Sequence, residues 1–158
     1  MSNSASRAPR KFLVVVDKTP ECKVAIRFAT RRALATGGRV TLLCVAQAPE
    51  IQQWRGVEEI MKDEAHQEAE ALIYAAAKTV NELSGIVCEL VIAEGRPIEA
   101  LRSLLTSDPE ISILVLATST AKEGPGPLVS TAVSGSAYPI PVTIVPGNLT
   151  DSDIDSLA

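Results

Sequence analysis

The sequence predicts an α/β fold: a doubly wound, five-stranded parallel sheet in a three-layer α/β/α arrangement, with strand order 3-2-1-4-5. Short apolar, β-branched runs alternate along the chain with helical patterns, which is typical of parallel strands joined by helices. The runs are apolar at nearly every position, as strands covered by helices on both faces require. At 158 residues the chain has the size of one domain.

The first half of the chain supplies two strands and two helices. Lys11–Asp17 is a continuous β-branched run with polar residues only at its ends. Pro20 follows a capping hydroxyl and so begins a helix, which Gly37 ends. Arg39–Ala46 is a second buried strand. A long helix over Val57–Leu83 follows, because its apolar positions recur every three or four residues.

The second half supplies three more strands. Ile86–Ala93 is the third, and Glu89 within it indicates one wetter face, as an edge strand allows. A short helix from Ile98 leads to the fourth strand, Ile111–Thr118. Val142–Val145 is a fifth strand with prolines on both sides, which suits the other edge of the sheet.

The strand order decides where a ligand would bind. Right-handed crossovers and wet outer strands favour the order 3-2-1-4-5, so the first and fourth strands are neighbours where the winding reverses. Ligands of such sheets bind beyond the carboxyl ends of the strands at that switch point. We therefore expect the loops Asp17–Pro20 and Thr118–Pro127 to converge on one crevice.

The loop after the fourth strand has the composition of an anion site. Gly124-Pro125-Gly126-Pro127 opens a new apolar pattern that begins at Leu128. A buried strand, a glycine loop and a helix start in that order bind phosphate, because the first helical N–H groups have no intrahelical partner. An ordinary surface turn that binds nothing has the same pattern, and both interpretations stay open.

Composition and charge exclude several classes of function. The net charge is −4 and the pI about 5.1, with acidic and basic residues interspersed, so we expect neither a nucleic-acid nor a membrane partner. No apolar run approaches the ~20 residues of a membrane span. Residues 1–10 lack the apolar core of a signal peptide and are predicted to be a flexible tail of a cytoplasmic protein. Residues 147–158 are predicted to be an acidic tail with at most one loose turn.

The residues available in the crevice do not predict catalysis. The glycine fingerprint of dinucleotide sites is absent after the first strand, and the loops do not match a phosphoacceptor or flavin site. The only histidine, His66, lies among carboxylates on the long helix, which indicates a solvated face rather than a metal site. No nucleophile–base constellation can be assembled, so we expect no catalytic residues, no metal site and no enzyme.

Three cysteines are too few for a disulfide framework. Cys44 and Cys88 fall inside apolar strands and are predicted to be small core residues. Cys22 is predicted in the first turn of a helix, where the helix dipole favours a thiolate. A redox role at Cys22 and an ordinary structural role there both remain open.

Four segments of the chain together resemble the universal stress protein family, over residues 11–146. They are FLVVVDKTPE at the first strand and the turn after it, VIAEGRPIEAL at the third strand, LVLATST at the fourth and PIPVTIVP at the fifth. The resemblance implies a small cytoplasmic α/β protein without a defined catalytic activity. It further implies a homodimer joined through the last strand, Val142–Val145. Many members bind ATP at the switch point, and others bind no nucleotide.

The loop departs from the pattern of the ATP-binding members, which is Gly-x-x-Gly, nine residues, then Gly-Ser or Gly-Thr. Aligning that last pair with Gly135-Ser136 leaves too few residues for a parallel crossover before the fifth strand. Counting back from Pro141 instead places it near Leu128–Thr131. In this preferred register Ser130 and Thr131 supply the phosphate hydroxyls, although Pro125 and Pro127 each remove a backbone donor.

The resemblance thus implies a nucleotide site at the switch point. Asp17 would accept a hydrogen bond from the adenine amino group, backbone near Val45 would line the base pocket, and Lys18 would help neutralise phosphate. The predicted ligand is ATP or another adenine nucleotide, with Mg²⁺; a monophosphate, an adenosine-like ligand and no ligand remain open as alternatives. The full predicted set is Val16, Asp17, Lys18, Val45, Thr118, Gly124, Gly126, Ser130 and Thr131.

A second hypothesis uses the same fold without a ligand. The doubly prolinated loop and the edge strand Val142–Val145 are also consistent with a homodimeric interaction scaffold that binds no nucleotide. Nucleotide affinity and oligomeric state separate the two hypotheses.

Overall fold

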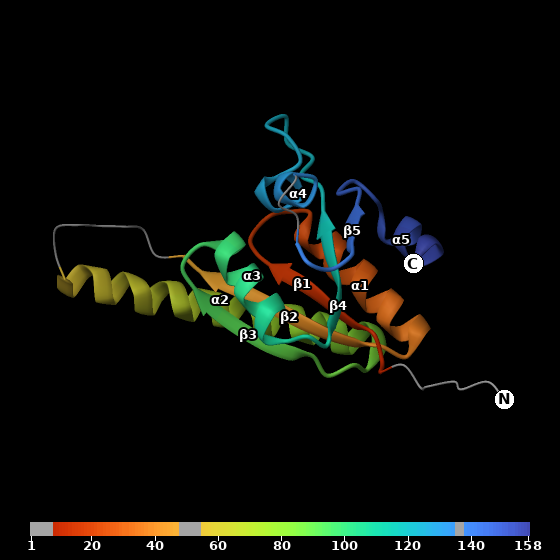
Figure 1. Ribbon diagram of the computed structural model, residues 1–158, viewed down its shortest axis with the longest axis horizontal. Helices are drawn as coiled ribbons and strands as arrows, with labels where there is room; N and C mark the ends of the chain where they lie inside the picture. The colour runs from red at the N-terminus through yellow and green to blue at the C-terminus, as the bar shows by residue number, and fades with distance from the viewer. Residues whose placement is uncertain (1–7, 48–54, 135–137) are drawn as a thin grey trace.

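The computed structural model describes residues 8–47, 55–134 and 138–158. Most of the predicted N-terminal tail and the Gly135-Ser136 pair lie outside the described residues. Five parallel strands form one sheet in the order β3-β2-β1-β4-β5, as the sequence predicts (Figure 1). The elements in chain order are β1 (Lys11–Val16), α1 (Cys22–Thr36), β2 (Arg39–Ala46), α2 (Arg55–Ser84), β3 (Glu89–Glu94), α3 (Pro97–Ser107), β4 (Ile111–Ala117), α4 (Pro127–Ala132), β5 (Val142–Val145) and α5 (Asp151–Leu157).

Strand β1 is the centre of the sheet, and all six of its residues are buried. It pairs in parallel with β2 on one side and with β4 on the other. Its continuous β-branched sequence fits this place because helices cover both faces of the sheet. Side chains that point to either face therefore meet apolar neighbours. The strand therefore fixes where the loops after β1 and β4 emerge.

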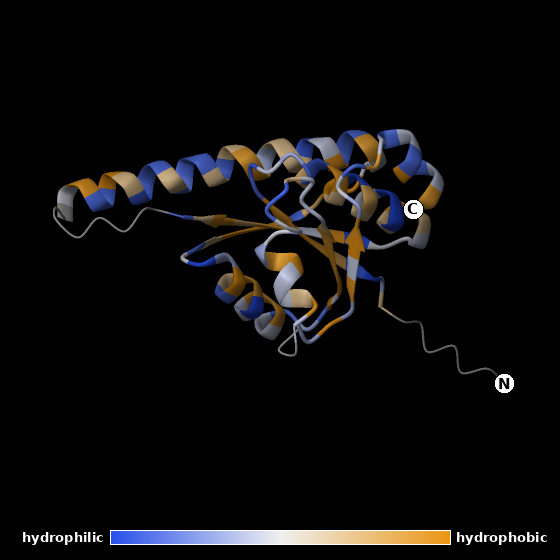
Figure 2. Cartoon of the chain, turned by 90° about the horizontal axis from the view of Figure 1, so that it is seen from above, coloured by the Kyte–Doolittle hydropathy of each residue, from blue (hydrophilic) through white to orange (hydrophobic). Residues whose placement is uncertain are grey.

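Helices cover the sheet on both faces and give the three predicted layers. One core cluster lies under α1 and α2, and the other lies against α3 and α4. Figure 2 shows the apolar colouring concentrated on the strands and on the helix sides that meet them. Each face is thus closed by a different pair of helices, and the carboxyl edge of the sheet opens between them.

The ends of several elements differ from the sequence prediction. Strand β3 begins at Glu89, not at Ile86, so the predicted strand residue Cys88 precedes it and is only half-buried. The apolar residues before Glu89 predict a strand, but Val87 is 86% exposed and pairs with no neighbouring strand. Helix α2 is slightly longer than predicted, because it already begins at Arg55.

The C-terminal segment is an ordered helix rather than the loose acidic turn that the sequence predicts. Helix α5 begins with a capping box in which Thr150 and Asp153 exchange side-chain to backbone hydrogen bonds. Its Ile154 is fully buried, and Asp155 receives hydrogen bonds from Arg27 at 2.9 and 2.8 Å. The acidic residues thus dock α5 on α1, a long-range contact that the local sequence does not reveal.

Truncating Ile154 should destabilise the whole domain. Ile154→Ala removes a fully buried side chain, and such substitutions cost about 2–5 kcal/mol. Leu157→Ala in the same helix is the matched control, because Leu157 is 68% exposed and should change stability by no more than about 0.5 kcal/mol. Urea denaturation measures both. Equal effects of the two substitutions would show that α5 is not docked.

The pairing of Asp155 with α1 should depend on pH. Hydrogen bonds from Arg27 lower the pKa of Asp155 to about 2, below its ordinary value of 3.8, with Arg31 contributing. A carboxylate with a depressed folded-state pKa stabilises the protein above the unfolded-state value and loses that effect as the pH falls through the folded-state value. The stability difference between wild type and Asp155→Asn should therefore be full above about pH 4 and vanish towards pH 2. Unfolding curves over this range test it, and a constant difference would contradict it.

Candidate functional site

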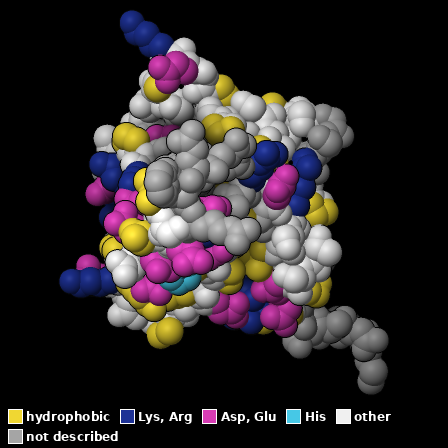
Figure 3. All heavy atoms as spheres, turned by 90° about the vertical axis from the view of Figure 1, so that its left-hand side faces the viewer, with side chains coloured by type: hydrophobic (Ala, Val, Ile, Leu, Met, Phe, Trp, Pro, Cys, Tyr) yellow, Lys and Arg dark blue, Asp and Glu magenta, His cyan; other side chains and the backbone are white. Residues whose placement is uncertain are grey.

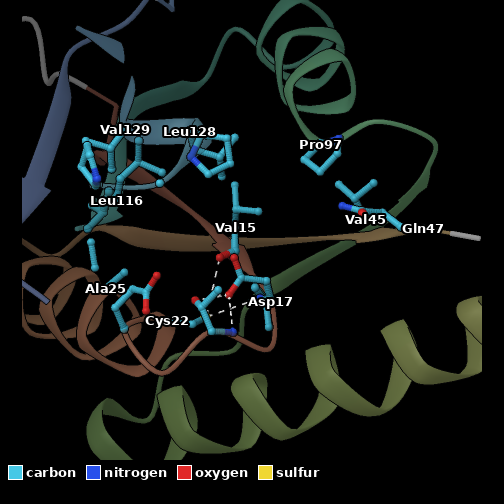
Figure 4. Close-up of a pocket in the computed structure, with 18 residues that line it drawn as sticks. Val15, Asp17, Cys22, Ala25, Val45, Gln47, Pro97, Leu116, Leu128 and Val129 are labelled. Atoms are coloured by element: carbon cyan, nitrogen blue, oxygen red, sulfur yellow. Dashed lines mark hydrogen bonds between the residues drawn. The ribbon is translucent and has the colours of Figure 1, made fainter. Parts of the chain in front are cut away.

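The turns after β1 and β4 lie side by side and frame one cavity of about 290 Å³, as the strand order predicts. Asp17 lies at the end of β1 and Ala117 at the end of β4, and both line the cavity. Figure 4 shows apolar side chains from several elements gathered around it, with Asp17 and Cys22 on one side. Its described apolar and proline lining includes Val15, Val45, Pro97, Leu116, Pro125, Pro127, Leu128 and Val129.

The Asp17 carboxylate is held by the turn that follows it. Its Oδ1 accepts hydrogen bonds from the backbone N–H of Thr19 at 2.9 Å and from the Thr19 hydroxyl at 2.5 Å. This is the local side-chain to backbone pairing by which aspartate stabilises turns. Both bonds use Oδ1. Among the contacts within the described parts of the chain, Oδ2 is therefore the oxygen still available to accept a hydrogen bond from a ligand.

Cys22 lies at the start of α1 as predicted, but its surroundings oppose a thiolate. Burial raises its pKa to about 11, which outweighs the opposite effect of the Asp17 N–H that points at its sulfur. Its Sγ lies 3.7 Å from the carbonyl oxygen of Val15, to which the thiol donates. Of the two roles left open for Cys22, the burial therefore favours the ordinary structural one, because desolvation opposes a thiolate at this position.

The glycine loop reaches the cavity at one of its two predicted glycines. Gly126 lines the cavity, whereas Gly124 does not. Both have positive φ, 105° at Gly124 and 101° at Gly126, a conformation that non-glycine residues rarely adopt. The carbonyl of Pro125 accepts a hydrogen bond from the backbone N–H of Ser119 at 3.0 Å. The loop is thus folded back on itself by a donor that a ligand would otherwise use.

The predicted phosphate hydroxyls lie outside the cavity lining. Ser130 is exposed on α4, and its backbone N–H donates to the Gly126 carbonyl at 2.9 Å. The Thr131 hydroxyl donates to the carbonyl of Pro127 at 2.9 Å, within its own helix. Helix α4 instead presents Leu128 and Val129 to the cavity (Figure 4). The rotation of α4 about its axis decides which of its side chains face the cavity. The spacing of glycines in the sequence does not predict that rotation.

Thr118 connects the ends of β4 and β5. Its backbone N–H donates to Val145 O at 2.9 Å, and its hydroxyl accepts from Gly147 N at 3.0 Å. A Cβ on Gly147 would lie 1.9 Å from the Thr118 carbonyl oxygen, so the close approach requires glycine. Thr118 therefore links the ends of β4 and β5 by hydrogen bonds and is not part of the cavity lining.

Lys18 points away from the cavity, to the α2 side of the sheet. It forms an ion pair with Glu68 of α2. Val16, Asp17, Lys18 and Val45 line a neighbouring hollow of about 310 Å³, and all of them except Lys18 also line the cavity itself. Of the predicted set, the base-side residues therefore come together, whereas the phosphate-side residues mostly do not.

Sequence reasoning missed several lining residues. Pro97 belongs to α3, Leu116 to β4 and Ala25 to α1, and Glu21 is the N-cap residue that precedes α1. The strand order predicted which loops meet, but it does not state which helix ends close over them. A signal for Pro97 was available, because the helix that follows β3 begins at the same edge of the sheet.

The described residues contain neither a membrane-spanning helix nor a metal-binding cluster. None of the described helices is long and apolar enough to cross a bilayer. No three His, Cys, Asp or Glu side chains within the described ranges are grouped to hold a metal ion. His66 instead pairs with Glu70 at 3.1 Å, one helical turn away.

The fold is shared with solved universal stress proteins. UspA from Lactobacillus plantarum is 21% identical, with a TM-score of 0.74 over 88% of this chain and 99% of its own. An Arabidopsis thaliana family protein solved with AMP bound is 16% identical, with a TM-score of 0.59 over 92% of this chain and 99% of its own. A universal stress protein in complex with cAMP is 20% identical, with a TM-score of 0.62 over 88% and 98%.

The sequence itself carries the family signal. No curated protein sequence gives a significant match. The sequence profile of the universal stress protein family, in contrast, matches residues 9–146, from just before β1 to the end of β5. The match therefore includes every strand of the sheet and both loops that frame the cavity. The chain belongs to the universal stress protein family.

Proposed function

We propose that this protein is a cytoplasmic stress-response module that binds an adenine-containing small molecule in the cavity at the β1/β4 switch point. The observation that carries the proposal is the cavity itself, which has apolar walls and the Asp17 carboxylate at its rim. Similar folds have been solved with AMP and with cAMP, which supports an adenine ligand. The proposed role is binding and does not include a chemical step.

The lining suits a purine ring better than a polar sugar or phosphate. Val15, Val45 and Leu116 would offer apolar surface to the faces of the ring, and Oδ2 of Asp17 would accept a hydrogen bond from the adenine amino group. The volume of about 290 Å³ lies at the lower end of the range for small-molecule sites, about 300–1,000 Å³. Mg²⁺ would enter only with a bound nucleotide.

Adenine ligands should raise the melting temperature. At 100 times its dissociation constant a ligand stabilises the folded state by about 2.7 kcal/mol, which in a domain of this size shifts the midpoint by roughly 5–10 °C. Asp17→Asn should shrink the ligand-dependent shift, because the amide cannot replace the carboxylate as an acceptor of equal strength. Asp63→Asn, an exposed aspartate on α2, is the control. Differential scanning fluorimetry with adenosine, AMP and ATP measures the shifts, and the absence of any shift would refute the proposal.

A second candidate function, a homodimeric scaffold, is favoured by the free edge of β5. In the described sheet β5 pairs with β4 alone, and its Ile144 is 37% exposed. An exposed apolar edge strand is a template for pairing with another strand. We therefore propose association of two copies through Val142–Val145, with or without a ligand.

Substitution on the edge should separate the two copies. Ile144→Lys places a charge on the proposed interface and should shift the protein from dimer to monomer. Val87→Lys is the control, because Val87 is 86% exposed and precedes β3 at the opposite edge of the sheet. Light scattering coupled to size exclusion gives the mass of each variant. A monomeric wild-type protein would eliminate this candidate.

A further inference from the structure

We propose that the cavity selects an uncharged nucleoside of the adenosine type over its phosphate esters. This inference rests on the proposed function, since it names the class of ligand for the same cavity. It is carried by three independent features of the site. These are the charge of the lining, the donors that prolines remove from the glycine loop, and the direction of Lys18, which follows Asp17 in the chain.

The ionised side chains in the lining are acidic. Asp17 and Glu21 line the cavity, and no Lys or Arg appears among its described lining residues. Of the segments that the structure does not describe, 48–54 and 135–137 contain neither Lys nor Arg, whereas residues 1–7 contain Arg7. A phosphate brought to this edge of the sheet would therefore meet like charge without a compensating cation in the lining.

Two prolines reduce the number of N–H groups that the loop offers to a phosphate. Pro125 and Pro127 have no backbone N–H, and both line the cavity. The N–H of Ser119 already donates to the Pro125 carbonyl, and that of Ser130 to the Gly126 carbonyl. Phosphate oxygens are acceptors that need such donors. Proline rings and internal hydrogen bonds therefore leave this loop with fewer donors for a phosphate.

The neighbouring cation is directed elsewhere. Lys18 follows Asp17 in the chain but is paired with Glu68 across the α2 side of the sheet. Figure 3 shows further acidic side chains gathered around the single histidine on the face it presents. These carboxylates add to the negative charge that a polyanion meets near the histidine on this face.

A nucleoside offers what these residues lack. Carboxylates are acceptors only, so Asp17 and Glu21 match the adenine amino group and the ribose hydroxyls, which are donors. The apolar walls match the faces of the base, and the volume of about 290 Å³ is small for a ligand site. The cavity therefore selects a ligand that is small and uncharged and that carries hydrogen-bond donors.

Calorimetric titration with adenosine, AMP and ATP at low ionic strength tests the inference. Adenosine should bind at least tenfold more tightly than AMP, and ATP more weakly still. Added salt should reduce the difference in affinity between adenosine and the two phosphate esters, because screening weakens repulsion between exposed charges. The affinity for adenosine should stay constant. Inosine, which lacks the amino group, should bind more weakly than adenosine.

A matched pair of variants tests the charge argument. Glu21 makes no side-chain capping bond to α1, so Glu21→Gln removes a charge and keeps an acceptor. This substitution should reduce the ratio of the affinity for adenosine to the affinity for AMP at least threefold. Glu82→Gln, at the far end of α2 with an exposed side chain, should leave the ratio unchanged.

The outcomes separate this inference from the proposed function. If AMP or ATP binds as tightly as adenosine, the inference is overturned while the proposed function stands. A ratio that Glu21→Gln leaves unchanged also overturns it, because the lining charge then has no role in selection. If none of the three ligands binds, the proposed function fails and the inference fails with it.

Discussion

The pairing of β1 with both β2 and β4 is the constraint on which the rest of the structure depends. It brings Asp17 and Ala117, far apart in sequence, to the same edge of the sheet. At the opposite edge the buried Lys11 ties β1 to Glu89 and Asp108, at 2.5 Å each. Burial lowers the pKa of Lys11, but its hydrogen bonds to both carboxylates outweigh burial and raise it. The central strand is thus fixed at both ends.

The fold could be predicted from the sequence because its signals are local and strong. Uniformly apolar runs identify buried strands, and Pro and Gly residues mark the helix ends between them. The register of β4 could not be predicted in this way. Lys11 pairs with Ile111, but Phe12 pairs with Ile113, so Ser112 is an extra residue whose hydroxyl accepts from Lys11 N at 3.0 Å. This bulge puts Ile111 and Ile113, two residues apart, on opposite faces of the sheet.

The site was predictable only to the level of which loops meet. Strand order alone identifies Asp17 and the loop after β4, because both follow from topology. The roles of Ser130 and Thr131 depend on the phase of a six-residue helix, and that of Lys18 on a partner fifty positions further along the chain at Glu68. Such contacts are decided by packing between distant segments, which no local pattern encodes.

Membership of a fold family and the chemistry of a site are therefore separate conclusions for this protein. The sheet is the part that it shares with its relatives, and the cavity follows from the sheet. The chemistry of the cavity depends on the side chains around it, which include Pro125, Pro127 and Glu21. They give the shared crevice a hydrophobic and acidic character.

Helix α2 is much longer than the sheet that it covers. Its 30 residues span about 45 Å, whereas the eight residues of β2 span roughly 26 Å. The buried residues of α2 lie between Ala69, at the middle of the helix, and Val80, and the first turns extend beyond the sheet (Figure 1). The free energy of local opening must therefore rise along the helix, since the first turns are held by helical hydrogen bonds with little tertiary packing. Fraying of α2 can therefore begin at its N-terminal end, beyond the carboxyl edge of the sheet, without loosening the core.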